Sequence, residues 1–211
     1  MKKIFFFVVI LMFEMMTYAQ KYRFDFYMYP PGGQSFVEYA GGTEMGVSMF
    51  KFEHTTFDSY LIQETYIGRV NMSSRVTYRY HFEDNAVISD VQIRQNQLTG
   101  STRTQDRITL FAFPDENKPY LWTETDRGDN VSGKSEYVYV MFCKKRTKAI
   151  KITKTTTFTI DKVKHKNIEK SYWVMGRGPV ISYRSNEKGE ERIVSKLNVD
   201  DEWFEGFAEI P

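Results

Sequence analysis

The clearest hydrophobic pattern in the chain lies between residues 75 and 95. Polar and apolar residues alternate from residue 75 to residue 83, which is the pattern of a strand with one buried face. The apolar face carries Val76, Tyr78, Tyr80 and Phe82. A turn-forming stretch, Asp84-Asn85-Ala86, separates this run from a second alternating run at residues 89–94. We therefore predict a β-hairpin in which Phe82 is buried and His81 is exposed.

Patterns with the same period of two predict strands along most of the chain. The expected strands are residues 22–29, 35–39, 47–53, 60–72, 107–113, 118–125, 135–143, 149–163, 167–175, 180–184 and 192–198. Residues 97–105 and 126–134 are polar and are expected to be loops, and a helical tendency is confined to residues 200–209. The sequence thus predicts an all-β fold with little helix: a single strongly curved antiparallel sheet, as a half-barrel or an open barrel.

Two stretches depart from simple alternation. Residues 135–143 carry apolar side chains on both faces, so we expect a central strand there. Residues 30–46 contain two prolines and several glycines, and are expected to form a long loop around the short extended piece 35–39. Long loops in compact domains are often functional, which makes this segment a candidate binding loop; a plain surface excursion is the alternative.

The N-terminal pattern indicates export. Two lysines precede an apolar block at residues 4–13 and the sequence Thr17-Tyr18-Ala19, an arrangement typical of a signal peptide that is cleaved after Ala19. The block is shorter than the roughly 20 residues that a membrane span needs. We expect residues 1–19 to be removed and residues 20–211 to form a single soluble domain, secreted or periplasmic and not an integral membrane protein. A short anchored helix is the alternative.

Composition adds constraints on stability and partners. Cys143 is the single cysteine, so no intrachain disulfide can form, and we expect it to be a small core residue. Aromatic residues make up 16% of the chain, which favours strands. The segment from Lys144 to Lys170 contains ten Lys or Arg residues and either attracts anionic partners or forms a solvated face. Because its lysines alternate with threonines rather than with stacking aromatics, we expect no nucleic-acid partner.

No specific catalytic or metal-binding signature occurs in the sequence. His54, His81 and His165 stand singly, and there is no serine-hydrolase elbow, phosphate loop or dinucleotide fingerprint. We therefore predict no metal site and no cofactor. His81 with Glu83 and Asp90 could form an acid–base group, although such residues on an outward face usually only solvate it. The sequence leaves enzyme activity open and favours a non-catalytic role.

One segment near the C-terminus resembles a known superfamily. The sequence KSYWVMGRGPVISYRSNEKGEERIVSKL, residues 170–197, is similar to the closing hairpins of secreted β-rich domains related to the periplasmic lipoprotein-carrier half-barrels. The matching residues are Tyr172, Trp173, Gly176, Gly178, Val180 and Gly189. Pro179 departs from the usual pattern. The resemblance implies a curved sheet whose apolar concave face binds a lipid or another apolar ligand.

Three functional readings follow. The first is an exported non-catalytic binding protein that holds a lipid or other apolar small molecule in the concave face of its sheet. Its candidate ligand-binding residues are Tyr78, Tyr80, Tyr120, Trp122, Tyr137 and Tyr139, since tyrosine and tryptophan combine an apolar ring with one polar group. The second is a surface module that binds a protein or glycan through the 30–46 loop and the basic segment. The third is a secreted hydrolase, which would need carboxylates that converge in a pocket.

Overall fold

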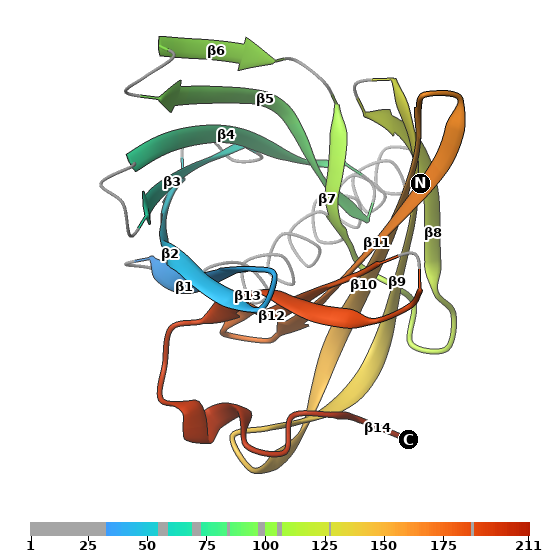
Figure 1. The fold of residues 1–211 in the computed structure, drawn as a ribbon. Coiled ribbons are helices and arrows are strands. Elements are labelled where there is room, and N and C mark those ends of the chain that lie inside the picture. Colours follow the sequence, from blue (N-terminus) through green and yellow to red (C-terminus); the bar gives the residue numbers. More distant parts are fainter. Residues whose placement is uncertain are drawn as a thin grey trace, which may run out of the picture.

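The computed structural model describes residues 33–54, 59–68, 73–83, 85–96, 100–104, 107–126, 128–186 and 188–211. The predicted signal peptide and the predicted strand 22–29 lie outside these residues. The described chain forms one antiparallel sheet and a single turn of 3-10 helix, which confirms the all-β prediction (Figure 1). No helix of the described chain is long and apolar enough to cross a membrane.

The strands are β1 (Gln34–Ala40), β2 (Thr43–His54), β3 (Ser59–Gly68), β4 (Ser73–Glu83), β5 (Ala86–Asn96), β6 (Gly100–Thr104), β7 (Ile108–Ala112), β8 (Tyr120–Asp126), β9 (Asp129–Phe142), β10 (Lys145–Ile160), β11 (Val163–Val174), β12 (Gly178–Ser185), β13 (Glu191–Leu197) and β14 (Glu209–Ile210). Their order in the sheet is β14-β9-β10-β11-β12-β13-β1-β2-β3-β4-β5-β6. The helix η1 (Asp201–Phe204) precedes β14. Strand β7 pairs with β5 beyond the end of β6, and β8 pairs with β9. The sheet curls so that β1–β6 and β8–β11 form opposite walls (Figure 1).

The predicted hairpin at residues 75–95 is confirmed as β4 and β5. Val76 and Tyr80 are buried, as the alternation requires, whereas His81, predicted to be exposed, is half-buried between Glu83 and Asp90. The pairing shifts between Arg79, which lies opposite Val91, and Tyr80, which lies opposite Ser89. This β-bulge places one extra residue in β5. The side chain of Phe82 lies outside the described residues, so its burial stays a prediction.

The extended piece predicted at residues 35–39 is confirmed as part of β1, but the long loop predicted around it at residues 30–46 is wrong over its described part. Residues 34–40 and 43–46 belong to β1 and β2, which a two-residue turn connects. Gly41 and Gly42 have φ values of +59° and +85°, and glycine adopts these angles without steric cost. The predicted loops 97–105 and 126–134 likewise contain β6 and the start of β9. Backbone pairing holds the polar strand β6, and at the start of β9 the one apolar side chain, Val131, is buried.

The core has an inner and an outer layer. On the concave face Phe36 meets Phe50 edge-on, with ring centroids 5.4 Å apart, and Phe111 packs 4.8 Å from Trp173. On the convex face the chain after β13 crosses β9, where Phe142 contacts three aromatic side chains. These are Trp203, Phe204 and Phe207, at centroid distances of 5.9, 5.5 and 6.5 Å. The outer layer explains why both faces of residues 135–143 are apolar.

The sheet does not close by a backbone ladder. Strands β7 and β8 lie near each other, but in the described chain they form no paired register. Instead, side chains form hydrogen bonds with backbone N–H and C=O groups on the edge of β7 that faces away from β5. The Ser135 hydroxyl donates to the Ala112 carbonyl (2.6 Å), the Thr109 N–H donates to Glu124 Oε2 (2.6 Å), and Lys154 Nζ donates to the Thr109 carbonyl. We call this junction the seam.

Two tight turns of the long β9–β10–β11 meander contain no glycine. Cys143 and Lys144 have φ values of +54° and +59°, and Asp161 and Lys162 have values of +49° and +67°. Both pairs match the type I′ turn, which requires positive φ at both central positions. Cys143, expected in the core, is half-buried and packs against it from the first of these turns.

The hydrogen bond of Ser135 at the seam predicts that removal of this single hydroxyl group destabilises the protein. Ser135 is fully buried, so Ser135→Ala leaves the Ala112 carbonyl without this donor in a buried place. We expect the free energy of unfolding to fall by about 1–3 kcal/mol. Ser132→Ala, an exposed position of the same strand, should change it by less than about 0.5 kcal/mol. Urea denaturation of both variants measures the difference, and equal effects would contradict the role of this bond.

The second turn predicts a stabilising substitution. Lys162→Gly should raise the free energy of unfolding by about 0.5–1 kcal/mol, because glycine removes the steric cost of the positive φ. Lys164→Gly is the control, since this exposed residue lies inside β11, where glycine should destabilise by about 0.5–1 kcal/mol. Thermal and urea denaturation should show changes of opposite sign. Destabilisation by both substitutions would refute the turn assignment.

Candidate functional site

A row of polar side chains crosses the concave face between β1 and β5. It consists of Glu38, Ser48, Glu64, Tyr78 and Gln92, one from each strand, and we call it the polar row. Ser48 is almost fully buried, and its hydroxyl donates to Glu64 Oε1 at 3.2 Å. The Tyr78 hydroxyl donates to Glu64 Oε2 at 2.7 Å, and Tyr78 lies directly opposite Gln92 in the sheet. Two carboxyl groups and a phenol thus share one connected interior surface.

The environment of the polar row shifts its proton equilibria. Burial raises the pKa of Glu38 to about 7, assisted by the charge of Glu64 and opposed by a hydrogen bond from Ser48. Burial, followed by the charge of Glu64, also raises the pKa of Tyr78, which keeps its phenol protonated. Glu38 therefore exchanges its proton near neutral pH, as a general acid would.

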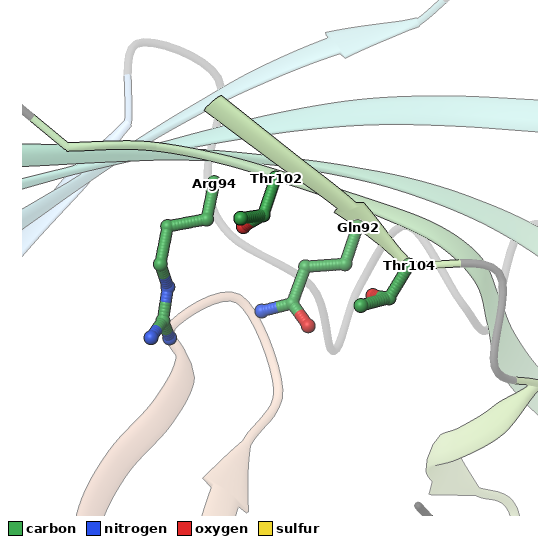
Figure 2. Close-up of a pocket in the computed structure, with 4 residues that line it drawn as sticks. All are labelled: Gln92, Arg94, Thr102 and Thr104. Atoms are coloured by element: carbon green, nitrogen blue, oxygen red, sulfur yellow. The ribbon is translucent and has the colours of Figure 1, made fainter. Parts of the chain in front are cut away.

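The polar row ends at a small pocket between β5 and β6 (Figure 2). Gln92 and Arg94 lie opposite Thr104 and Thr102, and the four side chains project to the same side. The pocket has a volume of about 130 Å³. A guanidinium, an amide and two hydroxyl groups offer mainly hydrogen-bond donors, so this space suits water or a small anionic group.

A larger cavity lies where the β1–β2, β10–β11 and β12–β13 hairpins meet. We call it the hairpin cavity; its volume is about 630 Å³. Its apolar lining includes Tyr39, Ala40, Phe158, Ile193 and Val194, and its charged lining includes Lys166, Arg184, Arg192 and Glu190.

The charged side chains of this cavity differ in whether they have partners. Arg184 bonds to Glu169 (Nε to Oε1, 3.0 Å). Lys166 and Arg192 are exposed and form no ion pair within the described chain. The cavity therefore combines apolar walls with a cationic rim.

The structure distributes the six predicted ligand-binding aromatics over several places. Tyr78 stacks on Tyr80 with centroids 5.7 Å apart, and Tyr80 belongs to the buried core. Tyr120 and Trp122 lie together on β8, 6.2 Å apart. Tyr137 and Tyr139 each hold a cation over the ring, respectively Lys148 at 4.0 Å and Arg146 at 3.7 Å. None of the six lines the hairpin cavity, and their role in binding stays a prediction.

The outward group around His81 is organised by arginines. His81 Nε2 lies 3.3 Å from Glu83 Oε2, and His81 Nδ1 lies 3.8 Å from Asp90 Oδ2. Arg107 binds Glu83 at 2.7 Å and Arg79 binds Asp90 at 2.9 Å. These hydrogen bonds lower the pKa of both carboxyl groups. The carboxylates are thus charged and bound to arginine, which makes them weak proton acceptors.

Acidic residues from other parts of the chain neutralise much of the basic segment. The ion pairs are Lys144 with Glu205 (3.0 Å), Lys148 with Glu116 (2.6 Å), Lys151 with Glu209 (2.9 Å) and Lys170 with Glu191. These pairs could not be predicted from the sequence, because each acidic residue lies far from its lysine along the chain. The segment presents fewer free cations than its composition indicates.

No protein-family model and no curated protein sequence matches the chain. A crystal structure from Bacteroides fragilis NCTC 9343, described as that of a presumed exported protein with a YmcC-like fold, is similar with a TM-score of 0.44 and 11% sequence identity. The similarity covers 81% of this chain and 97% of that chain. A likeness of this degree carries no inference about fold or function. The expected relationship to the lipoprotein-carrier superfamily is not confirmed.

Sequence reasoning missed the polar row, although one signal was visible. In the predicted strand 60–72, Glu64 shares its face with Tyr60, Ile62 and Tyr66. An acid among apolar residues on a predicted buried face indicates an interior polar group. Glu38 gives no such signal, because it lies in the segment 30–46, which the sequence predicts to be a loop. Ser48 lies in the predicted strand 47–53, where a single serine does not indicate a buried polar group.

The raised pKa of Glu38 predicts a pH dependence of stability. In the native state Glu38 keeps its proton over a pH range in which the unfolded chain has lost it, so stability falls as pH rises from about 4.5 to about 7. Glu38→Gln should flatten this part of the profile. Glu202→Gln, an exposed position, controls for the lost charge and should leave the slope unchanged. Urea denaturation at a series of pH values measures it, and an unaltered slope in Glu38→Gln would count against the assignment.

Proposed function

We infer that this protein is exported and binds an amphiphilic small molecule with an acidic head group in the hairpin cavity. The observation that supports this most directly is the cavity itself. Its volume of about 630 Å³ falls within the range of roughly 300–1,000 Å³ typical of small-molecule sites. The proposal narrows the expectation of a lipid or other apolar ligand, since it assigns the ligand a charged end.

The lining divides into two chemical regions. Phe158, Ile193 and Val194 provide an apolar surface, and burial of an alkyl chain against it contributes about 25 cal/mol per Å². Lys166 and Arg192 are exposed at the rim, where a carboxylate or phosphate could pair with them and remain partly solvated. The head group would thus stay at the rim while the apolar part enters the cavity.

The N-terminal pattern supports the export part of the proposal. A basic start, a short apolar block and a small-residue site before Gln20 are typical of a cleaved signal peptide. We propose that residues 20–211 form the mature protein as one domain. A protein outside the cytoplasm that carries an amphiphile needs a site that shields the apolar part from water, which the hairpin cavity would supply.

Paired ligands test the proposal. Titration calorimetry of the purified mature protein should detect binding of dodecanoate, and weaker binding of dodecanol. The double substitution Lys166→Glu and Arg192→Glu should weaken dodecanoate binding by about tenfold or more, because each change reverses a rim charge. Binding of dodecanol should not change. Lys188→Glu is the matched control, because it reverses an exposed charge of the β12–β13 turn outside the cavity lining.

Two results would contradict the proposal. One is the absence of binding for both ligands, together with recovery of no amphiphile by solvent extraction and mass spectrometry. The other is an equal loss of dodecanoate binding in the double variant and in Lys188→Glu, which would indicate attraction by the whole surface instead of a defined site.

A further inference from the structure

A second cavity, of about 200 Å³, lies at the seam. Its lining includes Tyr120, Trp122 and Glu124 from β8, together with Arg107 and Thr109. None of its lining residues also lines the hairpin cavity. Its volume is below the roughly 300–1,000 Å³ typical of drug-sized ligands, so it suits a molecule about the size of one ring. We call it the seam cavity.

Two aromatic rings form one wall of the seam cavity. The rings of Tyr120 and Trp122 lie 6.2 Å apart at an angle of 43°, and both side chains are half-buried. The Trp122 indole lies against the backbone of β9 at Gly133, where an added Cβ would come within 2.0 Å of the ring. Gly133 therefore permits the indole to lie close to the sheet. This arrangement fixes the wall on one side and leaves ring surface toward the cavity.

Two polar atoms of the same wall are buried without a hydrogen-bond partner in the described chain. They are Nε1 of Trp122 and Oε1 of Glu124. The other Glu124 oxygen accepts the Thr109 N–H at 2.6 Å, which holds the carboxyl group in place. Buried polar groups are nearly always hydrogen-bonded, and an unpaired group costs about 1–3 kcal/mol. Both residues line the seam cavity, but the two atoms themselves have almost no accessible surface. A ligand in the cavity would therefore supply the missing donor and acceptor only after a small movement of the side chains that cover them.

The two unpaired atoms restrict the ligand chemistry. The indole N–H needs an acceptor and the carboxylate oxygen needs a donor, and a hydroxyl group is both. A quaternary ammonium ion would favour the aromatic rings and the carboxylate, but it has no acceptor for the indole N–H. An alkyl chain offers neither group. A small ring with several hydroxyl groups and apolar C–H faces satisfies the rings and both polar atoms together.

We propose that the seam cavity binds a single neutral sugar ring, with hydroxyl groups that pair with Trp122 Nε1 and Glu124 Oε1 while a C–H face packs on Tyr120 and Trp122. The hydroxyl that accepts from the indole and the hydroxyl that donates to the carboxylate can be neighbours on one pyranose ring. The site is independent of the hairpin cavity, so neither proposal depends on the other.

The indole N–H signal of Trp122 in ¹H–¹⁵N NMR spectra provides a direct test. The protein has three tryptophans, and Trp122→Phe identifies this signal by its loss. Titration with methyl glucoside, methyl mannoside, methyl galactoside and N-acetylglucosamine at high millimolar concentration should shift the Trp122 signal for at least one sugar and leave that of Trp203 unchanged. Tetramethylammonium chloride and dodecanoate serve as the competing ligand classes.

Two variants distinguish binding from folding. Glu124→Gln should weaken binding of the sugar that shifts the signal by about tenfold. The amide oxygen is needed to accept the Thr109 N–H, so an NH2 group replaces the oxygen that accepts from the sugar hydroxyl. Tyr120→Ala should weaken it as well, and this residue makes no bond to the seam backbone. Each variant should keep the dispersed amide spectrum of the folded protein. A Trp122 signal that no sugar shifts, or that only tetramethylammonium shifts, would overturn the proposal, as would sugar affinity unchanged in both folded variants.

Discussion

The outward edge of β7 is the constraint on which the interior of this protein depends. A strand edge that turns away from water carries N–H and C=O groups that must find partners, and β8 does not supply them by a ladder. Ser135, Glu124 and Lys154 supply them instead, from three different strands. Hydrogen bonds from these three side chains therefore join the two walls of the sheet in place of a backbone ladder, and their positions determine where the walls meet.

This form of closure brings charge into the interior. Lys154 reaches the Thr109 carbonyl from β10, and burial lowers the pKa of its amino group although Glu124, Glu169 and Asp126 oppose that effect. On the opposite wall the polar row carries Glu38 and Glu64. A complete backbone ladder between β7 and β8 would need neither Glu124 nor Lys154 as a hydrogen-bond partner. The polar interior and the cavities beside it are thus consistent with a sheet that curls without completing a barrel.

Alternation along the chain was sufficient to predict the fold class and the β4–β5 hairpin, because burial of one face leaves a period of two in the sequence. It failed for β6, which is held by backbone pairing with its side chains mostly exposed, and for the start of β9, where two of the three buried positions are Gly133 and Ser135 and not apolar residues. It failed again at Gly41-Gly42, where glycines indicated a loop and instead close a two-residue turn. The hairpin cavity was beyond prediction for another reason: it exists because β13 pairs with β1, and sheet order is not encoded in local periodicity.

The aromatic layer on the convex face of β9 has a consequence for the order in which the chain can fold. Phe142 is covered by residues that follow four further strands, and β1 acquires its second neighbour only when β13 is present. Folds dominated by such distant contacts form slowly, since loop closure precedes the contacts that stabilise it. Until the residues after β13 are in place, β9 exposes an apolar surface through which the chain can associate with other chains. A truncation before Trp203 would remove the aromatic side chains that cover Phe142, and we expect such a chain to aggregate.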